Sequence, residues 1–169
     1  MGAVTQEYSA FTALTLTGLA SLASSATAGW RSALIDNRTI KARDYQFTFT
    51  LPMANTAPAN DRAIYPFLIP AVNDGTNWLY ADGGTATLPT AGPGTYSFAG
   101  ITTTNNFRLM QPFAYTTADQ TVQGSCFASQ ASGWAMWDGF LVFLLNFSGA
   151  AFDASGQAIG YKSISDSVA

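Results

Sequence analysis

Strict alternation of apolar and polar side chains is the feature that most constrains how this chain folds. Between residues 45 and 51, every odd position is aromatic or Leu and every even position is Gln or Thr. Successive side chains of a β-strand point to opposite faces, whereas a helix repeats every 3.6 residues. This segment therefore predicts a strand that buries one face and exposes the other to water.

Three further segments indicate strands of different kinds. Residues 14–17 alternate two Leu with two Thr, and residues 107–115 place Phe, Leu or Tyr at most odd positions. Pro112 lies inside the second segment and indicates an edge strand or a bulge, because proline cannot donate to a ladder. Gly139 to Phe147 is almost continuously apolar and is too short to be a membrane-spanning helix, which needs about 20 residues. We interpret it as a central strand buried on both faces.

Turn residues separate these segments. Asn73-Asp74-Gly75 stands between candidate strands at 67–72 and 76–80 and predicts a tight hairpin. Asp153 to Gly156 is interpreted in the same way, between residues 140–152 and 157–164. Residues 82–106 are rich in Gly, Pro and Thr and too long for a plain connection. We expect a surface excursion or contact loop there, with a short strand at 95–98.

About eight short strands joined by turns predict an all-β fold, an antiparallel β-sandwich that is jelly-roll-like with an extended N-terminal arm. We expect the arm and first strand within residues 1–28. Residues 29–169 would form a single β-sandwich domain with the excursion at 82–106. Residues 1–12 would be ordered by a neighbouring subunit, with Tyr8 and Phe11 as anchors.

The residues that most enzymes use are scarce. The chain has no His, one Cys (Cys126) and one Glu (Glu7), so Ser-His-Asp, Cys-His and zinc chemistry have no basis. Cys126 is expected to be a small buried hydrophobe. Most Asp residues stand in turn contexts, where Asp bonds its own backbone. We therefore expect no enzyme, no cofactor and no metal site, and two questions stay open: a glycan-cleaving Asp pair and a Ca²⁺ ion held by loop aspartates.

Charge and hydropathy bear on the partners. Ten acidic residues against seven basic ones give a net charge of −3, which argues against a nucleic-acid partner. Residues 1–28 resemble a secretion signal in their small residues, but the first basic residue is Arg31, so we expect no such signal and no membrane partner.

Two groups of side chains are candidates for contacts. The first is the four Trp residues, which we expect in the core or at a subunit interface, with stacking on sugar rings as the alternative. The second is the stretch from Arg31 to Arg43, which holds four of the seven basic residues and forms either a salt-bridged turn or a contact with an acidic neighbour. The candidate interface residues are Tyr8, Phe11, Trp30, Arg38, Trp134 and Trp137.

Residues 19–51 also carry a resemblance to a family. A Ser/Ala/Thr-rich stretch leads into a strand that ends in an Asp-Asn turn, and a second strand then carries alternating aromatics. Residues 30–36, 37–43 and 45–51 take these parts. This order resembles the opening of small β-sandwich or jelly-roll virion structural proteins of tailed bacteriophages, such as head decoration, fibre-base or tail-associated subunits.

The resemblance implies a non-enzymatic structural protein located in the virion. Its partners would be other copies of itself and other virion proteins, which it would contact through buried aromatic and aliphatic surface. The alternative hypothesis is a carbohydrate-binding module or a host-surface adhesin built on the same β-sandwich.

Overall fold

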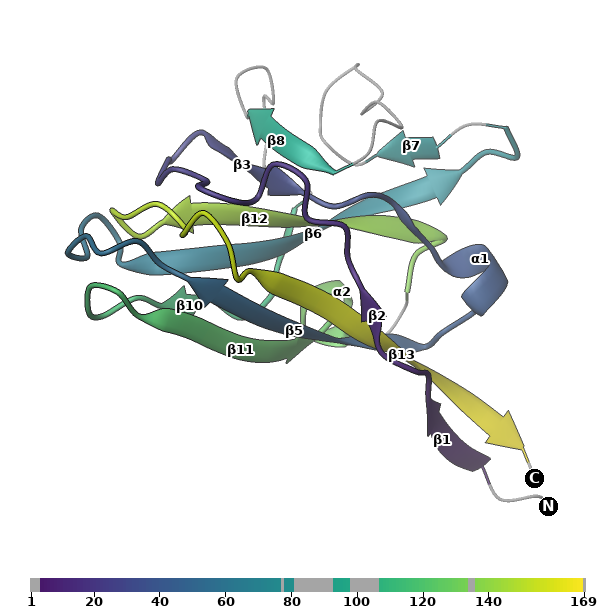
Figure 1. The fold of residues 1–169 in the computed structure, drawn as a ribbon. Helices are drawn as coiled ribbons and strands as arrows, with labels where there is room; N and C mark the ends of the chain where they lie inside the picture. The colour runs from purple at the N-terminus through teal and green to yellow at the C-terminus, as the bar shows by residue number, and fades with distance from the viewer. Residues whose placement is uncertain (1–3, 77, 81–92, 98–106, 134–135, 169) are drawn as a thin grey trace.

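Two antiparallel β-sheets face each other across the core in the computed structural model of the chain (Figure 1). The structure describes residues 4–76, 78–80, 93–97, 107–133 and 136–168. The first sheet, here called the β5 sheet, consists of β1 (Val4–Tyr8), β2 (Thr12–Ala13), β13 (Ala158–Val168), β5 (Asp44–Pro52) and β11 (Thr121–Phe127).

The second sheet, here called the β12 sheet, is larger. It consists of β10 (Phe113–Ala114), β6 (Ala63–Asn73), β12 (Gly139–Phe147), β3 (Ala28–Arg31), β8 (Gly94–Ser97), β4 (Ile35–Asp36), β7 (Trp78–Tyr80) and β9 (Arg108–Leu109). Two single-turn helices, α1 (Asn37–Ile40) and α2 (Ser129–Ser132), connect strands of the two sheets.

The strand order is that of a jelly roll. The β5 sheet runs β1-β13-β5-β11, and the main path of the β12 sheet runs β10-β6-β12-β3 before β8. Eight strands remain when β9 and β10 are counted as one interrupted strand and the short β2, β4, β7 and β8 are left out. If these eight are numbered along the chain, the first sheet holds strands one, eight, three and six. The second sheet then holds strands five, four, seven and two, which is the jelly-roll arrangement. The predicted all-β, jelly-roll-like sandwich is confirmed.

Alternation in β5 places its aromatic side chains in the core. The odd positions from Tyr45 to Leu51 are buried, and the even positions are half-buried or exposed. Tyr45 meets Phe140 of the opposite sheet edge-on, with ring centroids 5.0 Å apart, so the two sheets contact each other through aromatic rings. Cys126 is buried in the same core, as predicted.

The strand β12 is buried on both faces, as predicted for the apolar run at 139–147. Phe140, Val142 and Leu144 belong to the core between the sheets, whereas Leu141 and Phe143 belong to a second apolar cluster on the outer face. This second cluster explains why the strand shows no alternation, because neither face meets water.

One of the two predicted hairpins is confirmed. Residues Ala71–Asn73 of β6 pair with Trp78–Tyr80 of β7 around Gly75, whose φ is +102°. The hairpin predicted around Asp153–Gly156 is wrong, because β12 and β13 lie in different sheets. That turn instead carries the chain from one sheet to the other, which turn residues alone cannot distinguish from a hairpin.

The proline in residues 107–115 marks both an edge and a bulge, the two interpretations of that sequence. Phe113 pairs with Ile64 and Leu109 with Phe67, so three residues of this edge stand opposite two residues of β6. Residues 14–17 alternate in burial as expected but form no ladder of their own. Only Leu14 N donates to Ile159 O there, at 2.8 Å.

The N-terminal segment is extended and pairs with its own chain. All five residues of β1 pair with β13 in register from Val4–Val168 to Tyr8–Ile164. The excursion at 82–106 lies largely outside the described residues, but the short strand expected within it is present as β8. Within the part of the chain described, no helix is long and apolar enough to cross a membrane.

Candidate contact surfaces

The two chain ends form a two-stranded ribbon that extends beyond the sandwich (Figure 1). The strand β13 pairs with β5 only as far as Ile164, and from Ile164 to Val168 it pairs with β1 alone. Every residue of β1 is exposed, including Val4 at 66% and Tyr8 at 53%. The ribbon therefore offers apolar side chains and the open backbone edge of β1, and no other described strand pairs with β1.

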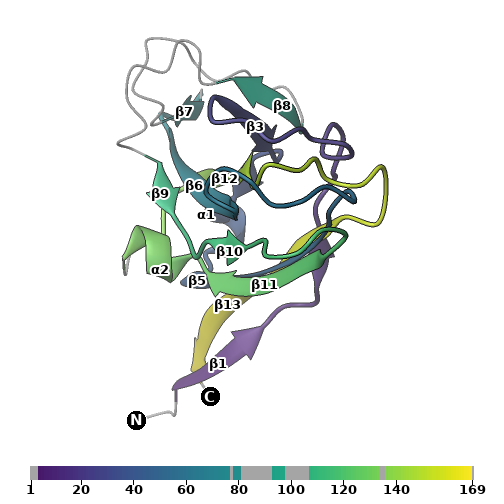
Figure 2. The ribbon, with the colours of Figure 1, turned by 90° about the vertical axis from the view of Figure 1, so that its left-hand side faces the viewer.

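An ion pair stands where β13 leaves the sandwich. Arg43 N donates to Ile164 O at 2.8 Å, and the Arg43 guanidinium donates to both carboxylate oxygens of Asp166 at 2.9 Å. Tyr8 pairs with Ile164 from the other side. Beyond Ile164 the Arg43 side chain thus occupies the edge of β13 where β5 has ended (Figure 2 shows the ribbon from the side).

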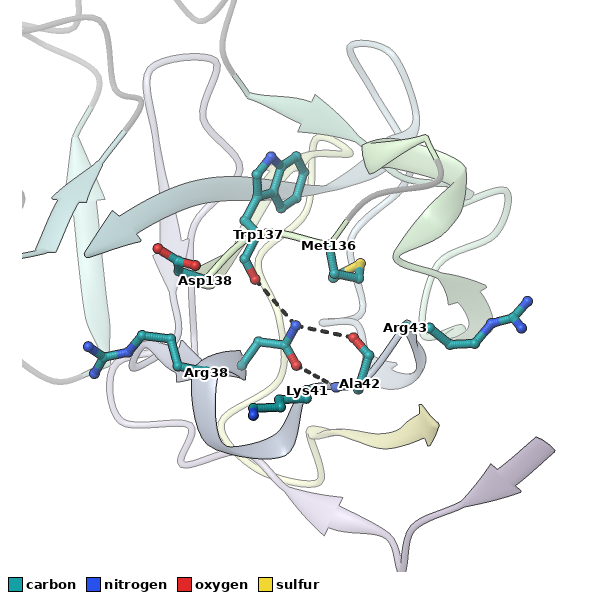
Figure 3. Close-up of a pocket in the computed structure, with 8 residues that line it drawn as sticks. Arg38, Lys41, Ala42, Arg43, Met136, Trp137 and Asp138 are labelled. Carbon is teal, nitrogen blue, oxygen red and sulfur yellow. Dashed lines mark hydrogen bonds between the residues drawn. The ribbon is translucent and has the colours of Figure 1, made fainter. Parts of the chain in front are cut away.

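Arg43 also lines a hollow of about 450 Å³ on the side of the sandwich (Figure 3). The loop from α1 to β5 forms one wall, and the segment before β12 forms the other. The lining residues are Asn37, Arg38, Lys41, Ala42, Arg43, Met136, Trp137 and Asp138. Three of them are cationic and Asp138 is acidic, and two of the cations form ion pairs, Arg38 with Asp36 and Arg43 with Asp166.

The buried side chain of Asn37 holds both walls of the hollow together. Its Oδ1 accepts hydrogen bonds from Ala42 N at 2.9 Å and from Tyr45 OH at 2.7 Å. Its Nδ2 donates to Ala42 O at 3.1 Å and to Trp137 O at 3.3 Å. Burial raises the pKa of Tyr45 far above its ordinary value, so this hydroxyl keeps its proton and stays a donor.

The cations around the hollow differ in their partners. Arg38 pairs with Asp36 at 2.8 Å and lies 4.5 Å from the centre of the Trp78 ring. The hydrogen bond from Arg38 holds the pKa of Asp36 below its usual range. No ion pair of Lys41 is found among the described residues. Lys41 has a left-handed backbone with φ 52°, which follows α1 and directs the chain into β5.

The six candidate interface residues fall into different places. Tyr8 lies on the ribbon, and Phe11, 53% exposed, lies against Gly160 on the outer face of the β5 sheet. Arg38 and the half-buried Trp137 line the hollow. Trp134 lies outside the described residues. The expectation for Trp30 as an interface residue is wrong, because its side chain is fully buried and its Nε1 donates to Thr17 O at 3.0 Å.

Two features of these surfaces were missed from the sequence. The sequence predicts a turn at Asn37, and its position beside Asp36 gives no sign that its side chain spans two segments a hundred residues apart. Val4 of the ribbon was not singled out either. An isolated valine carries no signal until its pairing partner in β13 is known.

Two aspartates of the described residues act in a helix cap and a turn. Asp36 caps α1 by accepting from Arg38 N at 2.9 Å, and Asp74 accepts from Thr76 N at 2.8 Å, as expected for Asp in turns. Burial raises the pKa of the Cys126 thiol to about 11. Among the residues described, no group of three His, Cys, Asp or Glu side chains could hold a metal ion.

Comparisons with known proteins give no relative. No family model, curated protein or solved structure matches the chain.

Proposed function

We propose that this chain is a structural subunit of a tailed-bacteriophage virion, without enzymatic activity, that acts through contacts with other virion proteins and other copies of itself. The single observation that carries the proposal is the projecting β1–β13 ribbon. Five residues of each strand form it, and every β1 side chain is exposed. The jelly-roll order of the sandwich behind it is an architecture that viral shell proteins use, and so do lectins.

The physical argument concerns stability. A two-stranded ribbon is marginally stable in water by itself, since it buries little apolar surface. A neighbouring subunit that covers Val4 and Tyr8, or adds a strand to an open edge, would bury that surface and complete the hydrogen bonds of that edge. The low proportion of charged residues, 10%, suits a surface that is covered in an assembly.

Binding to particles tests the proposal. Phage particles purified from cells that make this protein should contain it at a fixed ratio to the major shell protein, measured by quantitative mass spectrometry. Labelled recombinant protein should bind particles that lack it, and Tyr8→Lys should abolish the binding, because a lysine on the ribbon cannot be buried in an apolar contact.

Val72→Lys is the matched control. Val72 lies on β6 and is 52% exposed, close to the 53% of Tyr8, so both variants place one lysine on an exposed position. Val72→Lys should bind particles as the unmodified chain does. Absence of the chain from purified particles, together with no binding by the recombinant protein, would refute the proposal.

A second candidate function is carbohydrate binding at the hollow. It is favoured by the half-buried Trp137, which lines the hollow together with Arg38 and Lys41. An acidic sugar would use both kinds of group, stacking on an aromatic ring and accepting hydrogen bonds from the cations through its carboxylate. Titration with acidic and neutral glycans, followed by tryptophan fluorescence, tests it. Binding should weaken in Lys41→Ala, and a fluorescence signal that no glycan changes would exclude this candidate.

A further inference from the structure

The strand β11 forms an open edge of the β5 sheet. All seven of its residues pair with β5, from Thr121–Pro52 to Phe127–Gln46. No other strand of the described residues pairs with it, and it ends the strand order of its sheet. An edge strand carries a row of backbone groups that can pair with another chain.

The backbone groups on this open edge can be identified. Ala128 N donates to Tyr45 O at 2.8 Å, so the even-numbered residues at this end direct their backbone groups toward β5. The odd-numbered residues therefore direct theirs outward. Phe127 agrees, because its N–H bonds the side chain of Gln130 at 3.0 Å instead of β5. Gln123 and Ser125 remain as the central pair of outward residues.

Features that normally protect an edge are absent from β11. Its sequence, Thr-Val-Gln-Gly-Ser-Cys-Phe, has no charged residue and no proline. Two other edges differ, since β1 carries Glu7 and the β9–β10 edge carries Arg108, Pro112 and a bulge. The strand β8, which ends the β12 sheet, is uncharged but has only four residues. Charges, prolines and bulges are the usual means by which proteins prevent edge-to-edge pairing. The edge of β11 is thus the long described edge best suited to accept another strand.

We infer that β11 pairs antiparallel with β11 of a second copy of this chain, around a two-fold axis at Gly124. In this register Gln123 of each copy stands opposite Ser125 of the other copy. The two residues of each pair exchange their backbone hydrogen bonds. Gly124 then meets Gly124 at a position without hydrogen bonds, where the backbones approach to about 4.5 Å. Glycine suits this approach, and its missing side chain also leaves room for the Phe113 ring on the inner face.

Charge explains why the partner is an identical chain. Two copies of the same edge present the same charges, so a charged edge would repel its copy, whereas β11 has none. The adjoining outer positions of β5, Thr48 and Thr50, are also uncharged. The pair would form one continuous sheet through both molecules with an uncharged face across the two-fold axis.

Analytical ultracentrifugation of the purified chain tests this inference. The unmodified protein should form dimers, and the double variant Gln123→Lys/Ser125→Lys should weaken dimerisation at least about tenfold, because two pairs of lysines then face each other across the axis. The matched control is Thr48→Lys/Thr50→Lys. It adds the same charges one strand further from the edge, beside Ser125 and Gln123, and should dimerise normally.

A second variant guards against a general effect of charge. Ser125→Pro removes the outward N–H while leaving the ladder to β5 intact, and it should also yield monomers with an unchanged circular dichroism spectrum. A wild-type chain that stays monomeric at its highest soluble concentration would overturn the inference. Equal dimerisation of the wild type and the β11 double variant would overturn it as well.

This pairing is independent of the ribbon contact proposed above. The Tyr8→Lys variant should lose particle binding and keep the β11 dimer. The β11 double variant should lose the dimer and keep particle binding. Failure of one contact therefore leaves the other to be judged by its own measurement.

Discussion

The outer face of the β5 sheet carries Thr48, Gln123 and Ser125 in contact with water, whereas the outer face of the β12 sheet carries Leu141 and Phe143 buried beneath other parts of the chain. Tyr80 of β7 and Tyr96 of β8 pack against that second cluster, and the ring centres of Tyr96 and Phe143 lie 6.2 Å apart. One sheet thus has a single buried face, and the other has two.

This difference explains the two kinds of strand sequence. Alternation is required where only one face is buried, as in β5, and is lost where both faces are buried, as in β12. It also separates two roles. The covered face contributes stability within the chain, whereas the polar face and its open edge at β11 remain accessible to another molecule.

The largest effect is expected from Phe143→Ala on the covered face of the β12 sheet. The side chain is fully buried among Phe67, Tyr96 and Phe107, so its removal should lower the free energy of unfolding by about 3–5 kcal/mol. Urea denaturation measures this as a lower midpoint. A loss below about 1 kcal/mol would mean that the outer face of this sheet behaves as surface.

A smaller effect is expected at the crossover between the sheets, where α1 connects β4 to β5. Asn37→Ala removes the acceptor of the buried Tyr45 hydroxyl and should cost about 2–3 kcal/mol of unfolding free energy. A double-mutant cycle with Tyr45→Phe checks the cause. Tyr45→Phe should cost less in the Asn37→Ala background than in the unmodified chain, and equal costs would show that the two side chains act independently.

The inner face of the β5 sheet should make stability depend on pH through Cys126. Burial raises the pKa of this thiol to about 11 in the folded state, while the unfolded chain titrates near its ordinary value. As the pH rises, the Cys126 thiol therefore loses its proton first in the unfolded state. Its contribution to the free energy of unfolding is complete below the pKa of the unfolded state and falls as the pH rises from there to about 11. The loss should amount to about 2–3 kcal/mol. Urea midpoints for Cys126→Ala should decline less over this range than those of the unmodified chain, and parallel declines would assign the effect to other groups.

The smallest effect is expected on the polar face. Thr48→Ala should change the free energy of unfolding by no more than about 0.5 kcal/mol, since its side chain is exposed. Together with Phe143→Ala it compares outer-face positions of central strands in the two sheets. The same denaturation assay measures both, and a Thr48→Ala cost near that of Phe143→Ala would remove the distinction between the faces.

The elements with a clear local pattern were predicted from the sequence. The period of two in residues 45–51 and the apolar run at 139–147 both reflect burial, which acts on every residue of a strand and leaves a readable pattern. The turn at Asn73–Gly75 was predicted for the same reason, since its backbone needs residues that tolerate positive φ.

The contact surfaces could be predicted only in part. Tyr8, Phe11 and Arg38 were selected as exposed aromatic or basic residues, and the structure places them at the surface. Trp30 belongs to the same residue class but lies in the core, because a Trp is compatible with either environment. The residues around Trp30 in the sequence do not indicate whether its side chain lies in the core or at the surface.

What the sequence determined by itself is the class of fold: an all-β sandwich with one strand type exposed on one face and another buried on both. Each strand's pattern of side chains is local, and local physics suffices to produce it. Tertiary structure decided which strands share a sheet, that Asp153–Gly156 crosses between sheets, that Asn37 joins two distant segments, and that β11 ends a sheet with an open edge. These features depend on pairing between residues far apart in the chain, and a pattern along one strand does not specify its partner.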